Sequence, residues 1–225
     1  MAPRRSVRNM DAVRRRRLSL PAGIRATMIR AIANVVPSRT IDPRQLGWLA
    51  GRRATTRSNF PANFEYLDLR GAAPERVDRL LQEERDGYAY LEANGFSDAA
   101  VDEIDRRQAD ASALPMLDFG VAAAVAAVSA FGCVPVTSCR GPTLGRRPHS
   151  QPAPMIVFYA RRRHIAPLID AVVSADCHVV NNSAKLEVYA DDVRKLHRFA
   201  VALRRRLTPT IGDEPPRDAL DSDRP

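Results

Sequence analysis

Apolar residues recur at helical spacing in the first half of the chain and alternate at strand spacing in much of the second half. The clearest helical pattern covers residues 74–94, where one face is formed by Val77, Leu80, Leu81, Tyr88 and Leu91 and is interrupted by Glu84. Pro74 suits the first turn of this helix, and Asn94-Gly95 suits its end. Ser97 is placed to cap a second helix, whose acidic residues we interpret as a solvated face.

The second half of the chain predicts shorter elements in a mixed order. A small-residue helix at 117–132 leads into a strand at 133–137, which Pro135 restricts to a sheet edge or a strand end. A strand at 155–160 and a helix from 164 to 175 follow. Two strands at 177–181 and 185–190 form a predicted hairpin, and Asp191 or Asp192 caps a last helix.

These elements predict an α+β fold, with helices packed on one face of a small mixed sheet and a helical N-terminal region before it. We expect four parts: a disordered basic arm at 1–20, a helical region at 21–114, the α+β core at 115–208 and a disordered tail at 209–225. Within the helical region, further helices are expected at about 24–35 and after Pro43. The N-terminal helices either dock on the core or form a separate bundle, and the sequence leaves both arrangements open.

The charge of the chain is unevenly distributed. The formal net charge is +9, yet residues 1–60 hold fourteen arginines against two aspartates, and residues 61–130 hold six arginines against fourteen acidic residues. This separation favours ion pairs within the chain as well as binding of an external polyanion. We expect no membrane span. Three cysteines without a signal peptide indicate a reduced, cytoplasmic protein and not a disulfide scaffold.

The motif that narrows the search for a site is TSCRG at 137–141, directly after the predicted edge strand. Gly141 lets the backbone turn sharply, and backbone N–H groups in such a turn can form an anion-binding nest. Thr137 and Ser138 add hydroxyl groups, while Arg140 can bind phosphate and favour the thiolate form of Cys139. We therefore expect an anion-binding loop in which Cys139 is partly exposed and is the one candidate for a reactive group. The alternative is a half-buried Cys139 with a packing role only.

His149 is the candidate base for this thiol. It lies on the loop that follows Cys139, so the two residues are the candidate catalytic pair. His164 begins a later helix and could approach the same site. The donors available for zinc, which are Cys133, Cys139, His149, Cys177 and His178, do not have the spacing of a zinc knuckle. We expect no metal site.

Two groups of arginines complete the candidate site. Arg146 and Arg147 share the loop that carries Cys139, and Arg161, Arg162 and Arg163 follow the strand at 155–160. If both groups project from the same end of the sheet, they form a phosphate-binding footprint together with the basic arm. The arginine clusters therefore predict a nucleic-acid partner, with RNA as the expected one, and the N-terminal helices offer a surface for a protein partner.

The stretch MLDFGVAAAVAAVSAFGCVPVTSCRG resembles the wybutosine-synthesis tRNA methyltransferase family. In that family an acidic start, an apolar helix and a strand lead to a Thr-Ser-Cys-Ser-Gly turn. Thr137, Ser138, Cys139 and Gly141 match this turn, and Arg140 replaces the second serine. The resemblance covers about residues 118–207. It implies S-adenosylmethionine as a cofactor and modification of a tRNA base as the context.

Three functions remain open from the sequence. The first is binding of RNA or a nucleotide-like ligand at the TSCRG loop, in an RNA-modification context. The second is a non-catalytic protein-interaction or regulatory module. The third is a thiol-dependent enzyme that uses Cys139 and His149, and the sequence does not decide whether the protein is an enzyme.

Overall fold

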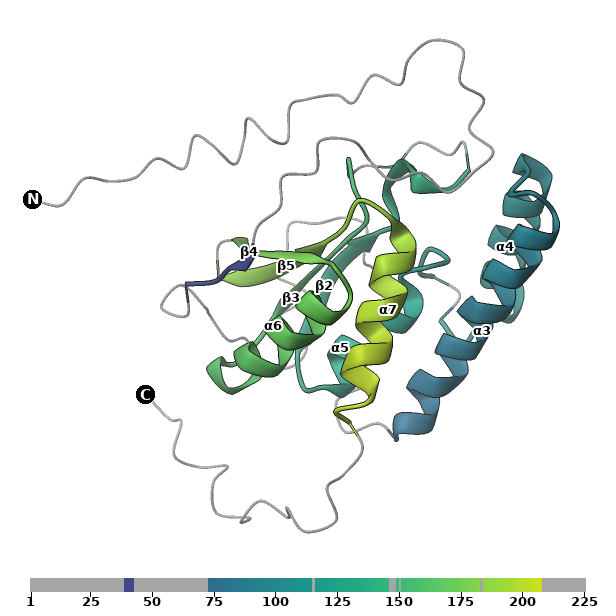
Figure 1. The fold of residues 1–225 in the computed structure, drawn as a ribbon. Helices are drawn as coiled ribbons and strands as arrows, with labels where there is room; N and C mark the ends of the chain where they lie inside the picture. The colour runs from purple at the N-terminus through teal and green to yellow at the C-terminus, as the bar shows by residue number, and fades with distance from the viewer. Residues whose placement is uncertain are drawn as a thin grey trace, which may run out of the picture.

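A five-stranded mixed sheet lies at the centre of the protein (Figure 1). The computed structural model describes residues 39–42, 73–114, 116–145, 149, 151–182 and 184–207. The strands run in the order β1-β4-β5-β3-β2 and comprise β1 (Arg39–Thr40), β2 (Val134–Cys139), β3 (Met155–Tyr159), β4 (His178–Asn182) and β5 (Lys185–Tyr189). β1 pairs with β4 in parallel, and the other neighbours are antiparallel.

Three helices cover one face of this sheet (Figure 1). They are α5 (Ala122–Ala130), α6 (Ile165–Ser174) and α7 (Val193–Arg204). Their apolar side chains form one core with Ile156 and Phe158 of β3 and with Leu186 and Val188 of β5. The predicted α+β fold is therefore confirmed. Within the described parts of the chain, none of the helices is both long and apolar enough to cross a membrane.

Two helices from the N-terminal half pack outside this layer. α3 (Pro74–Ala93) contacts α5 and α7, and its residues Val77, Leu80 and Leu81 belong to the main core. α4 (Asp98–Ala111) begins at Ser97, whose side chain accepts the N–H of Ala100 as predicted. The sequence leaves open whether the N-terminal helices dock on the core or form a separate bundle. In the structure, α3 docks on the core.

A buried carboxylate joins the outer helix to the inner ones. Glu84 interrupts the apolar face of α3, and it is only 1% exposed. One of its oxygens accepts the N–H of Ala123 at 2.9 Å in the first turn of α5, and the other lies 2.7 Å from Nδ1 of His197 on α7. A carboxylate at a helix N-terminus satisfies a backbone donor and interacts well with the helix dipole. The polar interruption of the apolar face is therefore an anchor for three helices.

β2 is an edge strand, as Pro135 predicts, and it contains a bulge. Pro135 pairs with Phe158 but Thr137 pairs with Val157, so Val136 is an extra residue in the ladder. In a regular strand, residues six apart share a face because side chains alternate with a period of two. The bulge reverses this relation for the two cysteines near the ends of β2. Cys133 lies in the core under the helices, whereas Cys139 packs with Met155 and Val157 on the other face.

Several expected boundaries differ from the observed ones. The small-residue helix is shorter than 117–132, because residues 116–121 form turns before α5. β2 extends beyond residue 137 to Cys139, and β1 had no sequence signal. The hairpin of β4 and β5 and the cap by Asp192 are confirmed. The basic arm, the helices at about 24–35 and after Pro43, and the tail at 209–225 lie outside the described residues.

Replacing Glu84 tests the role of this anchor. We expect Glu84→Ala to lower the free energy of unfolding by about 3 kcal/mol, because the change leaves the N–H of Ala123 and the ring of His197 without their acceptor. Glu92→Ala on the exposed face of the same helix is the matched control and should cost less than about 0.5 kcal/mol. Urea denaturation of both variants measures the difference, and equal losses would contradict the anchoring role.

Candidate functional site

Cys139 lies at the end of β2, on the sheet face opposite to the helices. The side chain is 6% exposed and packs with Met155, Val157 and Tyr189. The expectation of a partly exposed thiol is therefore wrong, since the bulge turns Cys139 toward side chains of the neighbouring strand. The site is a buried thiol at the rim of the sheet and not a projecting loop residue.

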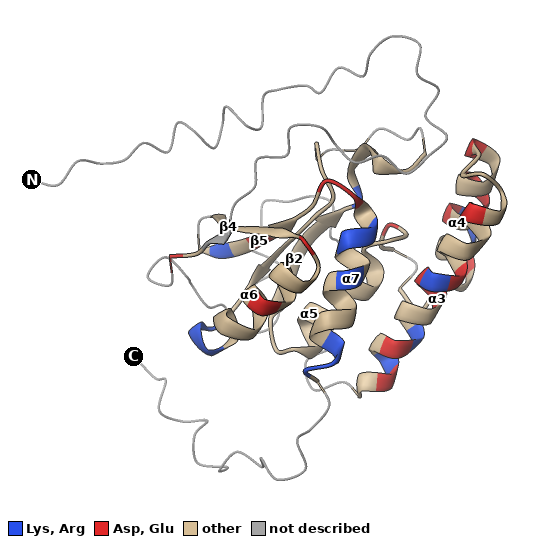
Figure 2. Ribbon diagram, in the orientation of Figure 1, with Lys and Arg blue, Asp and Glu red and all other residues tan. Residues whose placement is uncertain are grey.

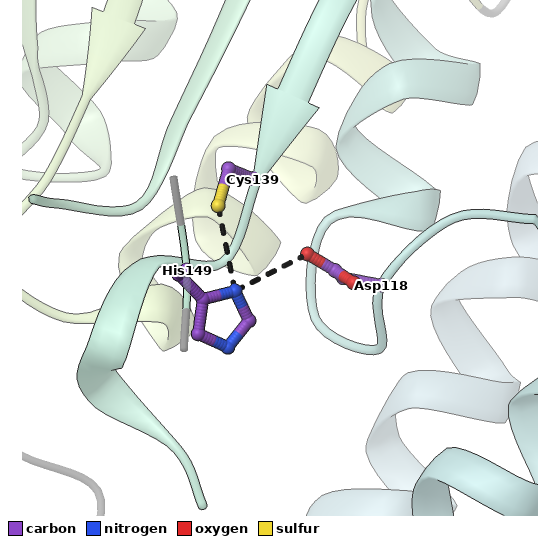
Figure 3. A group of neighbouring side chains, drawn as sticks. All are labelled: Asp118, Cys139 and His149. Atoms are coloured by element: carbon purple, nitrogen blue, oxygen red, sulfur yellow. Dashed lines mark hydrogen bonds and ion pairs between the residues drawn. The ribbon is translucent and has the colours of Figure 1, made fainter. Parts of the chain in front are cut away.

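Two nitrogen atoms lie close to the sulfur of Cys139. The backbone N–H of Gly141 donates to Sγ at 3.3 Å, and Nδ1 of His149 lies 3.5 Å from Sγ. His149 Nδ1 is also 3.8 Å from Oδ2 of Asp118. Figure 3 shows that the same ring nitrogen faces both Cys139 and Asp118. The structure thus brings the predicted pair together and adds a carboxylate to it.

Arg140 is buried behind this group. It is 1% exposed, and its guanidinium forms a two-pronged ion pair with Asp105 of α4 at 2.5 and 2.7 Å. Its Nε–H donates to Nε2 of His149 at 3.4 Å, and its backbone N–H donates to Asp118 at 3.2 Å. The prediction that Arg140 binds phosphate is corrected, because its guanidinium is engaged by Asp105 inside the protein. Arg140 instead holds the parts of the site in place.

Gly141 is required by the packing of the chain itself. It has φ +61°, and a Cβ at this position would lie 2.6 Å from the carbonyl carbon of Ala153. The space that the glycine leaves is therefore filled by the segment at 153–154 and is not an open cradle for a ligand. Thr137 is buried in β2, and Ser138 is partly buried.

A second cysteine–histidine pair lies at the other end of β2. Nδ1 of His164 is 3.6 Å from Sγ of Cys133, and Nε–H of Arg163 donates to Nε2 of His164 at 3.2 Å. Burial raises the pKa of Cys133 to about 12. Burial, with Arg163 and Arg161 nearby, lowers the pKa of His164 to about 4. His164 thus accompanies Cys133 and not Cys139, and this pair is a neutral, unreactive one.

Arg140 and the arginines at 161–163 lie toward opposite ends of the paired strands β2 and β3. β3 runs antiparallel to β2, with Met155 opposite Cys139 and Tyr159 opposite Val134. Arg161, Arg162 and Arg163 follow the far end of β3, roughly 17 Å along the strands from Cys139. Figure 2 shows this basic turn beside the start of α6. Arg146 and Arg147 lie outside the described residues, so the predicted common footprint is not formed by Arg140 and Arg161–Arg163.

Asp118, Cys139 and His149 form a group that could hold a metal ion. One oxygen, one sulfur and one nitrogen from these residues all lie within 4.8 Å of one another. Three such ligands with a free fourth position are the donor set of catalytic zinc sites. The expectation of no metal site stays a prediction, to which the structure adds that Asp118 lies beside Cys139 and His149.

Asp118 and Asp105 are the two site residues that sequence reasoning missed. Asp118 stands one residue before Phe119, which is buried against Gly87 of α3 and fixes the turn that presents the carboxylate. Its side chain is 41% exposed. Asp105 belongs to the acidic face of α4 that we interpreted as solvated, yet its side chain is 8% exposed. The sequence carries no signal for Asp105, because the burial of its partner Arg140 is known only from the structure.

No family model, no curated protein and no solved structure matches this chain. The function therefore has to be inferred from the geometry of these residues.

The Arg140–Asp105 pair is open to a direct test of stability. Asp105→Ala or Arg140→Met leaves one charge buried without its partner, so each should lower the free energy of unfolding by about 3–5 kcal/mol. The double variant Arg140→Met/Asp105→Leu should cost less than the sum of the single changes. Arg106→Ala, which removes two ion pairs of an exposed arginine from the same helix, should cost at most about 1 kcal/mol. Additive losses in urea denaturation would show that the two residues are not coupled.

Proposed function

We propose that the protein acts through the Cys139 thiolate, as a thiol-dependent enzyme in which Cys139 is the nucleophile. The observation that supports this is the pair of nitrogen groups at its sulfur, the N–H of Gly141 at 3.3 Å and Nδ1 of His149 at 3.5 Å. N–H donors stabilise a thiolate over a thiol, and the thiolate is the nucleophilic form. His149 accompanies the thiol at 8% side-chain exposure, so water competes little for the sulfur.

The other two cysteines provide an internal comparison. Burial raises the pKa of Cys133 and of Cys177 to about 12. At pH 7 such a thiol is ionised in only about one molecule in 10⁵. Cys133 also has a histidine nearby, so proximity of an imidazole alone does not distinguish Cys139. The distinguishing feature is the backbone N–H of Gly141 directed at the Cys139 sulfur.

Alkylation by iodoacetamide tests this proposal. The thiolate forms a bond from sulfur to the methylene carbon of the reagent while the carbon–iodine bond breaks and iodide leaves. At pH 7 Cys139 should be labelled about 100-fold faster than Cys133 and Cys177, because its thiolate is stabilised and theirs are not. Peptide mass spectrometry over a time course measures all three rates in one sample.

Cys139→Ser should remove the fast labelling phase and leave the two slow ones unchanged. Equal, slow labelling of all three cysteines in the folded protein would overturn the proposal and leave Cys139 a packing residue.

Binding of RNA or a nucleotide-like ligand, in an RNA-modification context in the cytoplasm, is a second proposal. What supports it is the turn after β3, where Arg162 and Arg163 are exposed next to each other. This site would lie away from Cys139 and would bind phosphate by charge. S-adenosylmethionine and a protein partner for the N-terminal helices stay predictions without a described site.

The salt dependence of binding tests the second proposal. Binding of single-stranded RNA, measured by fluorescence anisotropy, should weaken steeply with added salt, because each phosphate contact releases a counterion. Arg162→Ala/Arg163→Ala should reduce the salt slope by about 2, whereas Arg106→Ala/Arg107→Ala on α4 removes two exposed arginines elsewhere and is the charge-matched control. Binding that is absent, or unchanged in the double variant, would exclude this turn as the RNA site.

A further inference from the structure

We infer that Arg140, held by Asp105, is a positioning residue that fixes His149 in the tautomer with its proton on Nδ1. His149 then donates a hydrogen bond to the Cys139 sulfur and does not accept the thiol proton as a base. The inference deepens the proposed function, because it assigns the role of each neighbour of the nucleophile. It assigns His149 a different role from the base of a catalytic pair that the sequence led us to expect.

The side chain of Arg140 determines which nitrogen of His149 accepts a hydrogen bond. A guanidinium has only donors and stays protonated in proteins. Asp105 takes both terminal nitrogens of Arg140, at 2.5 and 2.7 Å, and the side chain is 2% exposed. Because these two bonds fix the guanidinium, its Nε–H points at Nε2 of His149, 3.4 Å away. Nε2 must therefore offer a lone pair.

The accepting Nε2 in turn determines where the ring proton of His149 lies. A neutral ring carries one N–H and one lone pair, so an accepting Nε2 places the proton on Nδ1. Nδ1 faces the sulfur of Cys139 at 3.5 Å and a carboxylate oxygen of Asp118 at 3.8 Å. Both are acceptors when ionised, so they suit this tautomer. A second proton would have to enter on Nε2, against the N–H of a buried guanidinium.

The charged groups around His149 act on different ring nitrogens. Asp118 and the Cys139 thiolate face Nδ1, which already bears a proton in the neutral ring. Arg140 faces Nε2 and opposes protonation there. The two anions are therefore satisfied by a neutral ring, and the positive charge of an imidazolium is not needed to bind them.

The same contact opposes metal binding by the three-residue group. A metal ion on Nδ1 would require its lone pair and would move the ring proton to Nε2. Histidine ligands donate that outer N–H to an acceptor such as a carboxylate or a carbonyl. Here it would meet the N–H of Arg140 instead. Asp118, Cys139 and His149 thus offer three possible metal ligands. The outer nitrogen of His149, however, faces a hydrogen-bond donor on Arg140 and not the acceptor that a histidine ligand needs.

The pair at the other end of β2 shows the same order of donors. Arg163 donates through Nε to Nε2 of His164, and Nδ1 of His164 faces Cys133. Arg163 differs from Arg140 in being exposed. His164 therefore serves as an internal comparison for His149. It is a neutral histidine between an arginine and a thiol, but its arginine is exposed, whereas Arg140 is buried in an ion pair with Asp105.

Nuclear magnetic resonance of the full chain labelled with ¹⁵N-histidine tests the inference. The chain has four histidines, and the His149 signals are those missing from His149→Asn. At pH 7.5 we expect Nδ1 of His149 to show the shift of a protonated nitrogen and Nε2 that of an unprotonated one. In Arg140→Lys, which keeps a positive charge but lacks the rigid fork, the proton should no longer be confined to Nδ1, so the Nε2 shift should move toward that of a protonated nitrogen.

The outcomes separate the inference from the proposed function. A proton on Nε2 of His149 in the unaltered protein, or a shift of Nδ1 on adding zinc chloride that is lost in Cys139→Ser, would overturn the inference. Either result together with fast alkylation of Cys139 would leave the nucleophile in place. Slow alkylation together with a proton on Nδ1 would overturn the proposed function and leave the tautomer assignment standing. If Arg140→Lys does not fold, the measurement on the unaltered protein decides alone.

Discussion

The ion pair between Arg140 and Asp105 is the interaction on which the site depends. It joins the residue that follows β2 to a helix from the other half of the chain, 35 residues earlier. A buried charge without a partner costs several kcal/mol, so the two side chains constrain each other strongly. Because the backbone of Arg140 also contacts Asp118 and its Nε contacts His149, the pair fixes the relative positions of three site residues.

Ion pairs within the protein account for part of the uneven charge along the sequence. The acidic segment supplies Asp105 for Arg140 and Asp78 for Arg204, so part of the separation is resolved by ion pairs within the chain. Figure 2 shows acidic residues along α3 and α4. The arginine of the TSCRG turn is consequently a structural residue. The interpretation of an arginine next to a cysteine as a phosphate ligand missed this, since it considered the turn alone.

The sequence predicted those features that depend on neighbours close along the chain. The apolar face of α3, the cap by Ser97, the edge position of a strand with Pro135 and the β4–β5 hairpin follow from local spacing or local chemistry. The bulge at Val136 could not be predicted, because one extra residue in a ladder depends on the pairing of β2 with β3. That single residue places Cys139 and Cys133 on opposite faces of the sheet. The burial of Asp105 was equally hidden, since helical periodicity alone placed it outward.

The surroundings of the Cys139 thiol are thus set by the ion pair between Arg140 and Asp105. The most direct measurement is the rate of Cys139 alkylation in Asp105→Asn, compared with the unaltered protein under conditions where circular dichroism shows both to be folded. Loss of the carboxylate charge should release Arg140, let His149 leave its position and slow the alkylation by about tenfold or more. A folded Asp105→Asn variant that reacts at the unaltered rate would contradict the dependence of the site on this ion pair.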